Sequence, residues 1–513
     1  MPRRIAALLV VGAAALAAVA ASTAPAVAAP TIALAPNALE APGGPVRVKS
    51  DWLRQSPGWS GCTAAGGNLH CYVPSDIREA YGVDQLPERG EGQTIVLVDS
   101  YGSPRAADEL QAFHDAFFPS LPQPSFDQVF PLGNPQLESG NPNANGQSGP
   151  GAASGWAGEA ALDVQWAYAI APLAHIVLLA VPPAETLGVQ GFPNLFKAID
   201  GAIDTYPAGT VFSMSLAAAE QSFGGAAQQQ ASRFDQVFQK GIAKGDSFFG
   251  ASGDNGTTGL SKQQKDSRPY AFPTAQWPSS SPYVTSVGGT QLQFGWTWNP
   301  QSDVPFAADG SFNPAYFSSA NAPGSSAATN VVWNESWLPA ATGGGPSTIY
   351  ARPSWQSSVA SVIGGDHRGL PDVSWNAAVN GAVLVNLQSF LAPADQGFYL
   401  IGGTSAATPQ VAALTALANE RRESMGKAPL GNVSERLYAI GSAAFTDVAP
   451  VHQGAAGVIS GNLDSNTMFS YNGDGNAVAV GSVPGWPALE GWDMTTGFGT
   501  PWAPTYVAEL AAT

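Results

Sequence analysis

The feature that most constrains the fold is an alternation of short apolar runs with longer helix-like stretches. Each apolar run has the length of a strand that is buried on both faces. Such alternation is typical of an α/β fold in which a parallel sheet is covered by helices on both faces. The expected strands are residues 94–100, 175–181, 210–216, 247–252 and 283–289, and the expected helices include residues 106–118 and 228–245.

Two stretches interrupt this alternation and are rich in Gly, Asn, Pro and Ser, namely residues 133–155 and residues 291–328. Such composition predicts surface loops. Long loops of this kind often shape access to an active site, so we expect them near one.

The first 28 residues have the layout of a cleavable secretory signal. Arg3 and Arg4 precede an Ala/Val/Leu run that ends at the small residues 26–28. A membrane anchor is the alternative, but the run is Ala-rich and Pro30 follows it instead of a charged stop. We therefore expect a secreted, extracellular protein with three parts: a signal peptide at residues 1–28, an extension or short pro-segment at residues 29–71, and a main domain at residues 72–513.

Composition argues against nucleic acid and membranes as partners, and the two cysteines predict one disulfide. The formal net charge is -17, and the expected signal removes only positive charges, so neither nucleic acid nor a membrane surface is an expected partner. Because only 12% of residues are charged, few ion pairs are lost when carboxylates protonate, and an acidic working pH is a reasonable hypothesis. Cys62 and Cys71 are expected to form one local disulfide, as is common in exported chains.

The most specific motif is GGTSAATPQ, which begins at Gly402. The glycines end a strand, Thr404 and Ser405 stand at a helix start, and Pro409 fits the first turn, where a missing N–H is harmless. A hydroxyl at the positive end of a helix dipole, among free backbone donors, suits a nucleophile that forms an oxyanion. An ordinary Ser/Thr helix cap explains the same local pattern.

A second motif places two carboxylates on one helical face. Glu159 and Asp163 are four residues apart, so their side chains project one turn from each other. Among Trp156, Leu162 and Val164 two like charges are costly, and one pKa is expected to rise, so that Glu159 can hold or accept a proton. Two acids on a solvated helix face are the simpler interpretation of this motif alone.

A third acid, Asp254, follows an expected strand in the segment SGDNG. Taken alone, an aspartate between glycines is most often a turn former. Together, however, GEAALD, SGDNG and GGTSAATP resemble the motifs of the sedolisin (serine-carboxyl peptidase) family, in the family's order, within the subtilisin-like superfamily. The resemblance extends from Tyr72 to the end of the chain and implies a subtilisin-like fold.

The resemblance implies a role for each acid. Ser405 attacks the peptide carbonyl, Glu159 is the general base and then the acid, and Asp163 orients Glu159. Asp254 stabilises the oxyanion, which it can do by hydrogen bonding only while protonated. The strand at residues 212–220 is expected to be an edge strand that pairs with the substrate backbone, and its substrate-binding residues are Ser213, Met214, Ser215 and Leu216.

The resemblance also implies one structural calcium ion near the C-terminus. Its expected ligands are the side chains of Asp447 and Asp493 and backbone carbonyls of Val448, Leu489 and Gly491. Without the resemblance, two loop aspartates with no ion explain the same residues.

Three functions are therefore compared. The first is a secreted serine endopeptidase that acts on peptides or proteins at acidic pH as a monomer, with tripeptidyl-peptidase action as a variant. The second is a conventional subtilisin-like hydrolase, for which Asp99 lies where the relay aspartate would stand, but none of the five histidines is followed by glycine. The third is a catalytically silent binding protein on a peptidase scaffold. The intact set of four catalytic positions favours the first.

Overall fold

The computed structural model describes residues 35–36, 69–133, 150–181, 188–259, 269–298, 321–323, 327–335, 340–448, 464–471 and 479–513. The predicted signal peptide at residues 1–28 and Cys62 lie outside these residues, as do residues 449–463, which precede part of the predicted calcium site. The predicted boundaries at residues 28 and 71 therefore stay predictions.

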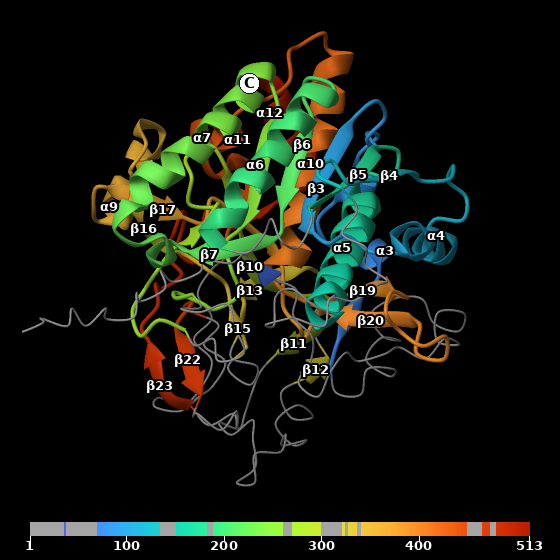
Figure 1. The fold of residues 1–513 in the computed structure, drawn as a ribbon. Coiled ribbons are helices and arrows are strands. Elements are labelled where there is room, and N and C mark those ends of the chain that lie inside the picture. The colour runs from blue at the N-terminus through green and yellow to red at the C-terminus, as the bar shows by residue number, and fades with distance from the viewer. Residues whose placement is uncertain are drawn as a thin grey trace, which may run out of the picture. The chain divides into compact units, whose positions relative to one another are not determined.

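An eight-stranded sheet forms the centre of the domain (Figure 1). All of its strand pairs are parallel except the pair of β13 with β10. The predicted parallel sheet is thus confirmed, with one antiparallel edge. The strand order is β13 (Thr329–Val332), β10 (Thr285–Gln293), β8 (Ser247–Ala251), β6 (Val211–Met214), β3 (Thr94–Ser100), β5 (His175–Val181) and β4 (Ser125–Val129), and β18 (Val373–Asn376) pairs with β10.

Helices cover this sheet and extend beyond it (Figure 1). They are α3 (Pro74–Ala80), α4 (Ala106–Phe117), α5 (Pro150–Ile170), α6 (Gly188–Thr205), α7 (Ala227–Lys244), α9 (Ala360–Ile363), α10 (Thr404–Ser424), α11 (Val433–Ile440) and α12 (Ala503–Ala512). Short 3-10 helices are η1 (Val83–Gln85), η4 (Glu220–Ala226), η5 (Ser354–Val359) and η6 (Gly441–Ala444). Within the described residues no helix combines the length and the apolarity that a membrane span needs.

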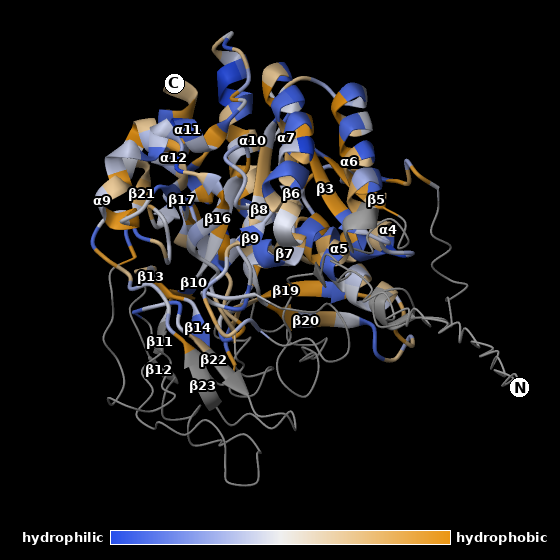
Figure 2. Ribbon diagram, turned by 60° about the vertical axis from the view of Figure 1, so that its left-hand side comes forward, coloured by the Kyte–Doolittle hydropathy of each residue, from blue (hydrophilic) through white to orange (hydrophobic). Residues whose placement is uncertain are grey.

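Alternate residues of the strands β3 and β5 are buried in two separate hydrophobic cores. In β3, Ile95 and Leu97 pack into one core with residues of α5 and α10. Val96 and Val98 pack into the other core with residues of α6 and α7. This period of two explains why β3 and β5 each contain an unbroken hydrophobic run, residues 95–98 and 176–181 (Figure 2). The prediction of helices on both faces of the sheet is confirmed.

Smaller sheets surround the central one. Two have three strands: β1 (Ala35–Pro36) with β7 (Leu216–Ala219) and β9 (Gln276–Trp277), and β2 (Cys71–Tyr72) with β19 (Ala382–Leu387) and β20 (Gly397–Ile401). The others are pairs: β11 (Trp296–Trp298) with β12 (Asn321–Pro323), β14 (Asn334–Glu335) with β15 (Ala340–Ala341), β16 (Gly345–Ala351) with β17 (His367–Leu370), β21 (Phe445–Thr446) with β24 (Thr500–Pro501), and β22 (Met468–Tyr471) with β23 (Ala479–Val483).

Three details differ from the sequence predictions. The predicted loop at residues 291–328 contains the end of β10 and the pair β11–β12, because strands of three residues leave little periodic signal. The predicted loop at residues 133–155 ends in the first turns of α5. Pro409 lies inside α10 rather than in its first turn, because the helix already begins at Thr404.

Candidate active site

Ser405 stands in the first turn of α10, a helix whose residues 404–419 are all buried. The turn into this helix needs glycine, since Gly403 has a φ of 106° and a side chain on Gly402 would meet the Ala377 carbonyl oxygen at 2.7 Å. Ser405 Oγ is buried and has no hydrogen-bond partner among the described residues. The predicted helix start at Thr404 and Ser405 is therefore confirmed. The Ser405 hydroxyl makes no hydrogen bond within the described residues.

Asp254 is hydrogen-bonded to Thr404, the residue before Ser405. Its Oδ1 accepts hydrogen bonds from the backbone nitrogen of Thr404 at 2.8 Å and from Thr404 Oγ1 at 2.6 Å. Its Oδ2 is buried and makes no hydrogen bond within the described part of the chain. Burial raises the pKa of Asp254 to about 7, although the Thr404 bonds oppose the rise. At acidic pH this carboxyl is protonated, so it has a proton to donate.

Glu159 and Asp163 lie on α5, which packs along α10. Both side chains are completely buried, so the solvated helix face that the sequence left open is wrong. Asp163 Oδ1 accepts a hydrogen bond of 2.8 Å from Ser215 Oγ. Burial, followed by the charges of Asp99 and Glu159, holds the pKa of Asp163 well above its usual range.

Asp99 is a third acid that acts on Asp163, and the sequence placed it only as the relay aspartate of a conventional subtilisin-like hydrolase. It lies near the carboxyl end of β3, fully buried, and neither carboxyl oxygen has a hydrogen-bond partner among the described residues. Burial raises its pKa to about 8. The available signal was a charged residue at the end of an otherwise apolar strand, which is rare without a purpose.

The described histidines do not form a relay with Ser405, whose hydroxyl has no hydrogen-bond partner among the described residues. His114 Nδ1 lies 2.7 Å from the hydroxyl of Tyr168, and His175 Nε2 lies 3.0 Å from Asp127. His452 lies outside the described residues. Within the described part of the chain, the start of α10 is hydrogen-bonded to a carboxyl group, that of Asp254.

The expected substrate strand is divided in two. Residues 211–214 form β6, which lies between β3 and β8, so Ser213, paired on both sides, is not on an edge. The edge-strand prediction is wrong for this half. Leu216 begins β7, which leaves the central sheet, and Ser215 lies at the break between the two strands. The prediction of a substrate-pairing strand therefore remains only for Leu216 and Ala217.

The edge of β7 that remains for a substrate is paired with the N-terminal segment. Ala35 lies opposite Ala217 and Pro36 lies opposite Leu216, in antiparallel register. The strand β1 also contacts α5, the helix of Glu159 and Asp163. The other neighbour of β7 is β9, which pairs with Ala218 and Ala219. A peptide that binds along Leu216 and Ala217 therefore has to displace β1.

The two aspartates of the predicted calcium site meet the same loop. Asp447 Oδ2 accepts a hydrogen bond of 2.7 Å from the nitrogen of Gly491, and Asp493 Oδ2 accepts one of 2.9 Å from Leu489. Asp493 is buried, which raises its pKa to about 6. No three His, Cys, Asp or Glu side chains converge as a metal group in the described ranges, so carbonyls would have to complete the site. Two carboxyl groups that reach one loop are oxygen ligands of the kind that calcium takes.

Cys71 is buried in β2 and is not a free thiol. Its expected partner, Cys62, lies outside the described residues, so the Cys62–Cys71 pairing stays a prediction.

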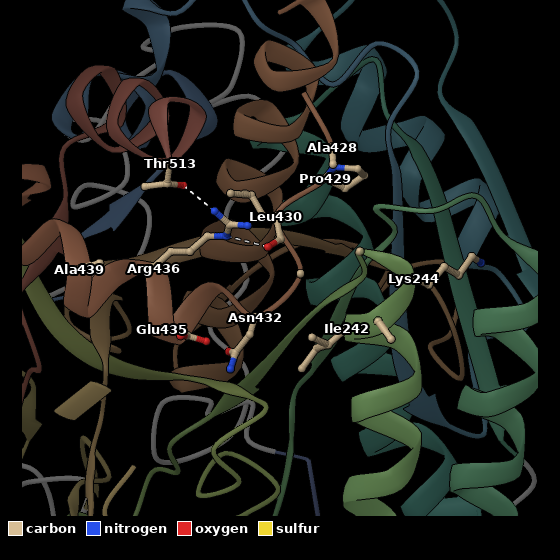
Figure 3. A pocket seen from close by; sticks show the side chains of 13 residues that line it. Ile242, Lys244, Ala428, Pro429, Leu430, Asn432, Glu435, Arg436, Ala439 and Thr513 are labelled. Carbon is tan, nitrogen blue, oxygen red and sulfur yellow. Dashed lines mark hydrogen bonds between the residues drawn. The ribbon is translucent and has the colours of Figure 1, made fainter. Parts of the chain in front are cut away.

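A separate surface pocket of about 650 Å³ lies between the ends of α7 and α11 (Figure 3). Arg436 in its wall donates through Nε to the Leu430 carbonyl at 2.7 Å and through Nη1 to Thr513 Oγ1 at 2.9 Å. None of the predicted site residues lines this pocket. We therefore place the candidate active site at the start of α10.

The structure is that of an α/β protein with a mostly parallel central sheet, and a buried carboxyl group, Asp254, is hydrogen-bonded to the start of α10. A model of the subtilase family (peptidase S8) matches residues 181–440, just over half of the chain. The chain therefore belongs to the subtilase family.

Named relatives lie in the sedolisin branch. Kumamolisin from Bacillus sp. (strain MN-32) is 28% identical over 441 residues, which are 84% of this chain and 62% of that protein. A probable tripeptidyl-peptidase from Arthroderma benhamiae is 26% identical over 459 residues, 85% of this chain and 64% of that protein. Sedolisin from Pseudomonas sp. (strain 101) is 32% identical over 275 residues, 52% and 35% of the two chains. The predicted resemblance is confirmed, although the chain spans less than two thirds of these relatives' lengths.

A solved structure shows the same fold. Pseudomonas sedolisin, a serine-carboxyl proteinase in complex with pseudo-iodotyrostatin, superposes with a TM-score of 0.59 at 22% identity. The superposition covers 87% of this chain and 100% of that one. The subtilisin-like fold predicted from the motifs is therefore confirmed.

Proposed function

We propose that this protein is a serine-carboxyl peptidase that hydrolyses peptide bonds through an acyl-enzyme on Ser405. The observation that carries the proposal is the pair of hydrogen bonds from Thr404 to Asp254 Oδ1. These bonds fix a buried carboxyl one residue away from a buried serine with an uncommitted hydroxyl. Such an arrangement suits a nucleophile with an adjacent oxyanion donor.

In the proposed reaction, Ser405 Oγ attacks the carbonyl carbon of the substrate while its proton passes to Glu159. Asp163 lies one helical turn away and supports the charge distribution on Glu159. Glu159 then returns the proton to the leaving amine nitrogen as the C–N bond breaks. A water molecule repeats these steps on the ester bond, which releases the acid and restores Ser405.

Asp254 is proposed to stabilise the oxyanion of each tetrahedral intermediate. Its Oδ1 is held by Thr404, so the proton that it donates belongs on Oδ2. Because the pKa of this carboxyl is about 7, it is protonated below that pH. We propose on this basis that the enzyme works in acid.

The proposed substrates are peptides or unfolded proteins that pair with Leu216 and Ala217 as an added strand. Support comes from the antiparallel pairing that β1 already makes with these two residues. We propose cleavage inside chains by a monomer, and release of tripeptides would indicate the other specificity.

We propose that one calcium ion binds where Asp447 and Asp493 meet the loop that contains Leu489 and Gly491. Carbonyls of Val448, Leu489 and Gly491 would complete the ligands. When bound, the ion supplies positive charge that offsets the burial of Asp493. Its proposed role is structural.

We also propose that the protein acts outside the cell. The layout of residues 1–28 and the oxidised state of Cys71 support secretion. Detection of the processed chain in the growth medium of the producing cells tests this proposal.

The test of function is the pH profile of hydrolysis of a denatured protein by the purified chain, Ser405→Ala and Glu159→Gln. We expect activity that is highest in acid and is lost in both variants. Mass spectrometry of the products separates internal cleavage from tripeptide release. No hydrolysis at any pH by a folded chain would favour a catalytically silent binding protein.

A further inference from the structure

Ser215 lies between β6, a strand of the central sheet, and β7, the strand that we propose binds substrate. Met214 ends β6, Leu216 begins β7, and Ser215 belongs to neither strand. Its side chain is completely buried and donates a hydrogen bond of 2.8 Å to Asp163 Oδ1. A residue that served substrate through its backbone alone would not need this hydroxyl.

Two other carboxyl groups act on Asp163 through their charge. The charge of Asp99, which lies in β3, and that of Glu159, which lies on the same helix as Asp163, both disfavour ionisation of Asp163. The Ser215 hydroxyl acts in the opposite sense, because a donor to a carboxylate stabilises the ionised form. Asp163 Oδ2 has no hydrogen-bond partner in the described part of the chain. Since Ser215 donates to Oδ1, a proton carried by Asp163 belongs on Oδ2.

We infer that Ser215 is a positioning residue: its hydroxyl fixes the orientation and protonation of Asp163 and links this carboxyl to the substrate strand. The inference rests on the proposed peptidase function and adds a residue to it. A peptide paired with Leu216 fixes the backbone next to Ser215, and the hydroxyl passes that constraint to Asp163. The Ser215 side chain thereby couples substrate binding to proton transfer.

The test compares the pH dependence of kcat and KM for Ser215→Ala, Ser215→Thr and the unsubstituted chain. Loss of the hydroxyl favours protonated Asp163, so the limb of the kcat profile that is set by ionisation of Asp163 moves to higher pH, by about one unit. We expect kcat near the acidic optimum to fall about tenfold, with a smaller change in KM. Ser215→Thr keeps a hydroxyl and is expected to restore the position of the limb.

Ser286→Ala is the matched control, because Ser286 is also completely buried in the sheet and its Oγ has no hydrogen-bond partner among the described residues. It should leave the profile unchanged. If Ser215→Ala does not fold, Ser215→Cys keeps the volume with a weaker donor and should shift the limb in the same direction.

Superimposable profiles of the unsubstituted chain and a folded Ser215→Ala or Ser215→Cys variant would overturn the inference while leaving the peptidase function intact. An unsubstituted chain without hydrolytic activity would instead overturn the proposed function on which the inference rests. The two failures are therefore distinguishable in one set of measurements.

Discussion

Asp254 accepts two hydrogen bonds from Thr404, at 2.8 Å from the backbone nitrogen and 2.6 Å from the hydroxyl. This pairing fixes the carboxyl against the first residue of α10. It also determines which oxygen is used in each role, because Oδ1 accepts both bonds and Oδ2 accepts none among the described residues. An asparagine at this position keeps the acceptor on one atom and a donor on the other.

Asp254→Asn therefore gives the first prediction. With aspartate, activity is expected to decline as pH rises through about 7, because the oxyanion donor loses its proton. Asn keeps its N–H donors at any pH, so the alkaline limb should move upward or disappear. The pH profile of kcat/KM measures this change.

Asp254→Ala is the companion variant, because it removes the donor altogether. We expect kcat to fall about 10²–10³-fold, and the decline near pH 7 to be lost because alanine has no carboxyl that titrates there. An alkaline limb that stays near pH 7 in Asp254→Asn would assign that limb to another group.

The buried acids predict that stability falls as pH rises. Asp99 has a pKa of about 8 in the folded chain, against about 3.9 when unfolded, so the folded state binds more protons between these values. Its stabilising effect is complete below about pH 4 and is lost towards pH 8, at about 1.4 kcal/mol per unit. The unfolding free energy of Ser405→Ala, which avoids autolysis, should decrease between pH 5 and pH 8.

Asp99→Asn in the same background should flatten that dependence, whereas Asp395→Asn, at an exposed position, should not. A free energy of unfolding that rises with pH over this range would contradict the expected protonation of the cluster.

Calcium should raise the thermal unfolding midpoint of the folded chain. A ligand at 100 times its Kd stabilises by about 2.7 kcal/mol. Asp447→Asn should reduce the shift, since Asp447 is exposed and contacts the loop at Gly491. The exposed Asp366 provides the control, Asp366→Asn. If calcium leaves the midpoint of the unsubstituted chain unmoved, the proposed site is wrong.

Removal of β1 should improve peptide binding. A chain that starts at residue 41 lacks the pairing of Ala35 and Pro36 with β7, whereas a chain that starts at residue 31 retains it. Because a substrate must replace these contacts, we expect KM about tenfold lower for the shorter chain. Equal KM values would show that β1 and substrate do not compete.

Much of the fold was predictable because apolar runs of strand length have a direct physical meaning. The runs that became β3 and β5 are buried on both faces, and their bounds match the sequence prediction. By contrast, β11 and β12 are too short to show a period, and Gly-rich and Asn-rich flanks suggested a loop. Short strands depend on tertiary pairing rather than on local pattern.

The motifs predicted four residues of the candidate site but not the contacts that these residues make. Motif spacing indicated Glu159, Asp163, Asp254 and Ser405. The approach of Asp99 to Asp163 depends on how β3 packs against α5, and a single sequence carries no signal of that distance. The same holds for Ser215, whose hydroxyl turns toward Asp163 only because the strand breaks there.

The proposed nucleophile Ser405 is best tested by covalent labelling of the purified chain with a fluorophosphonate probe in acid, followed by peptide mapping by mass spectrometry. We expect one adduct, on Ser405, that forms much more slowly in Glu159→Gln although the unfolding midpoint of this variant is unchanged. A folded chain that gives no adduct on Ser405 at any pH, or labels equally fast in Glu159→Gln, would contradict this expectation.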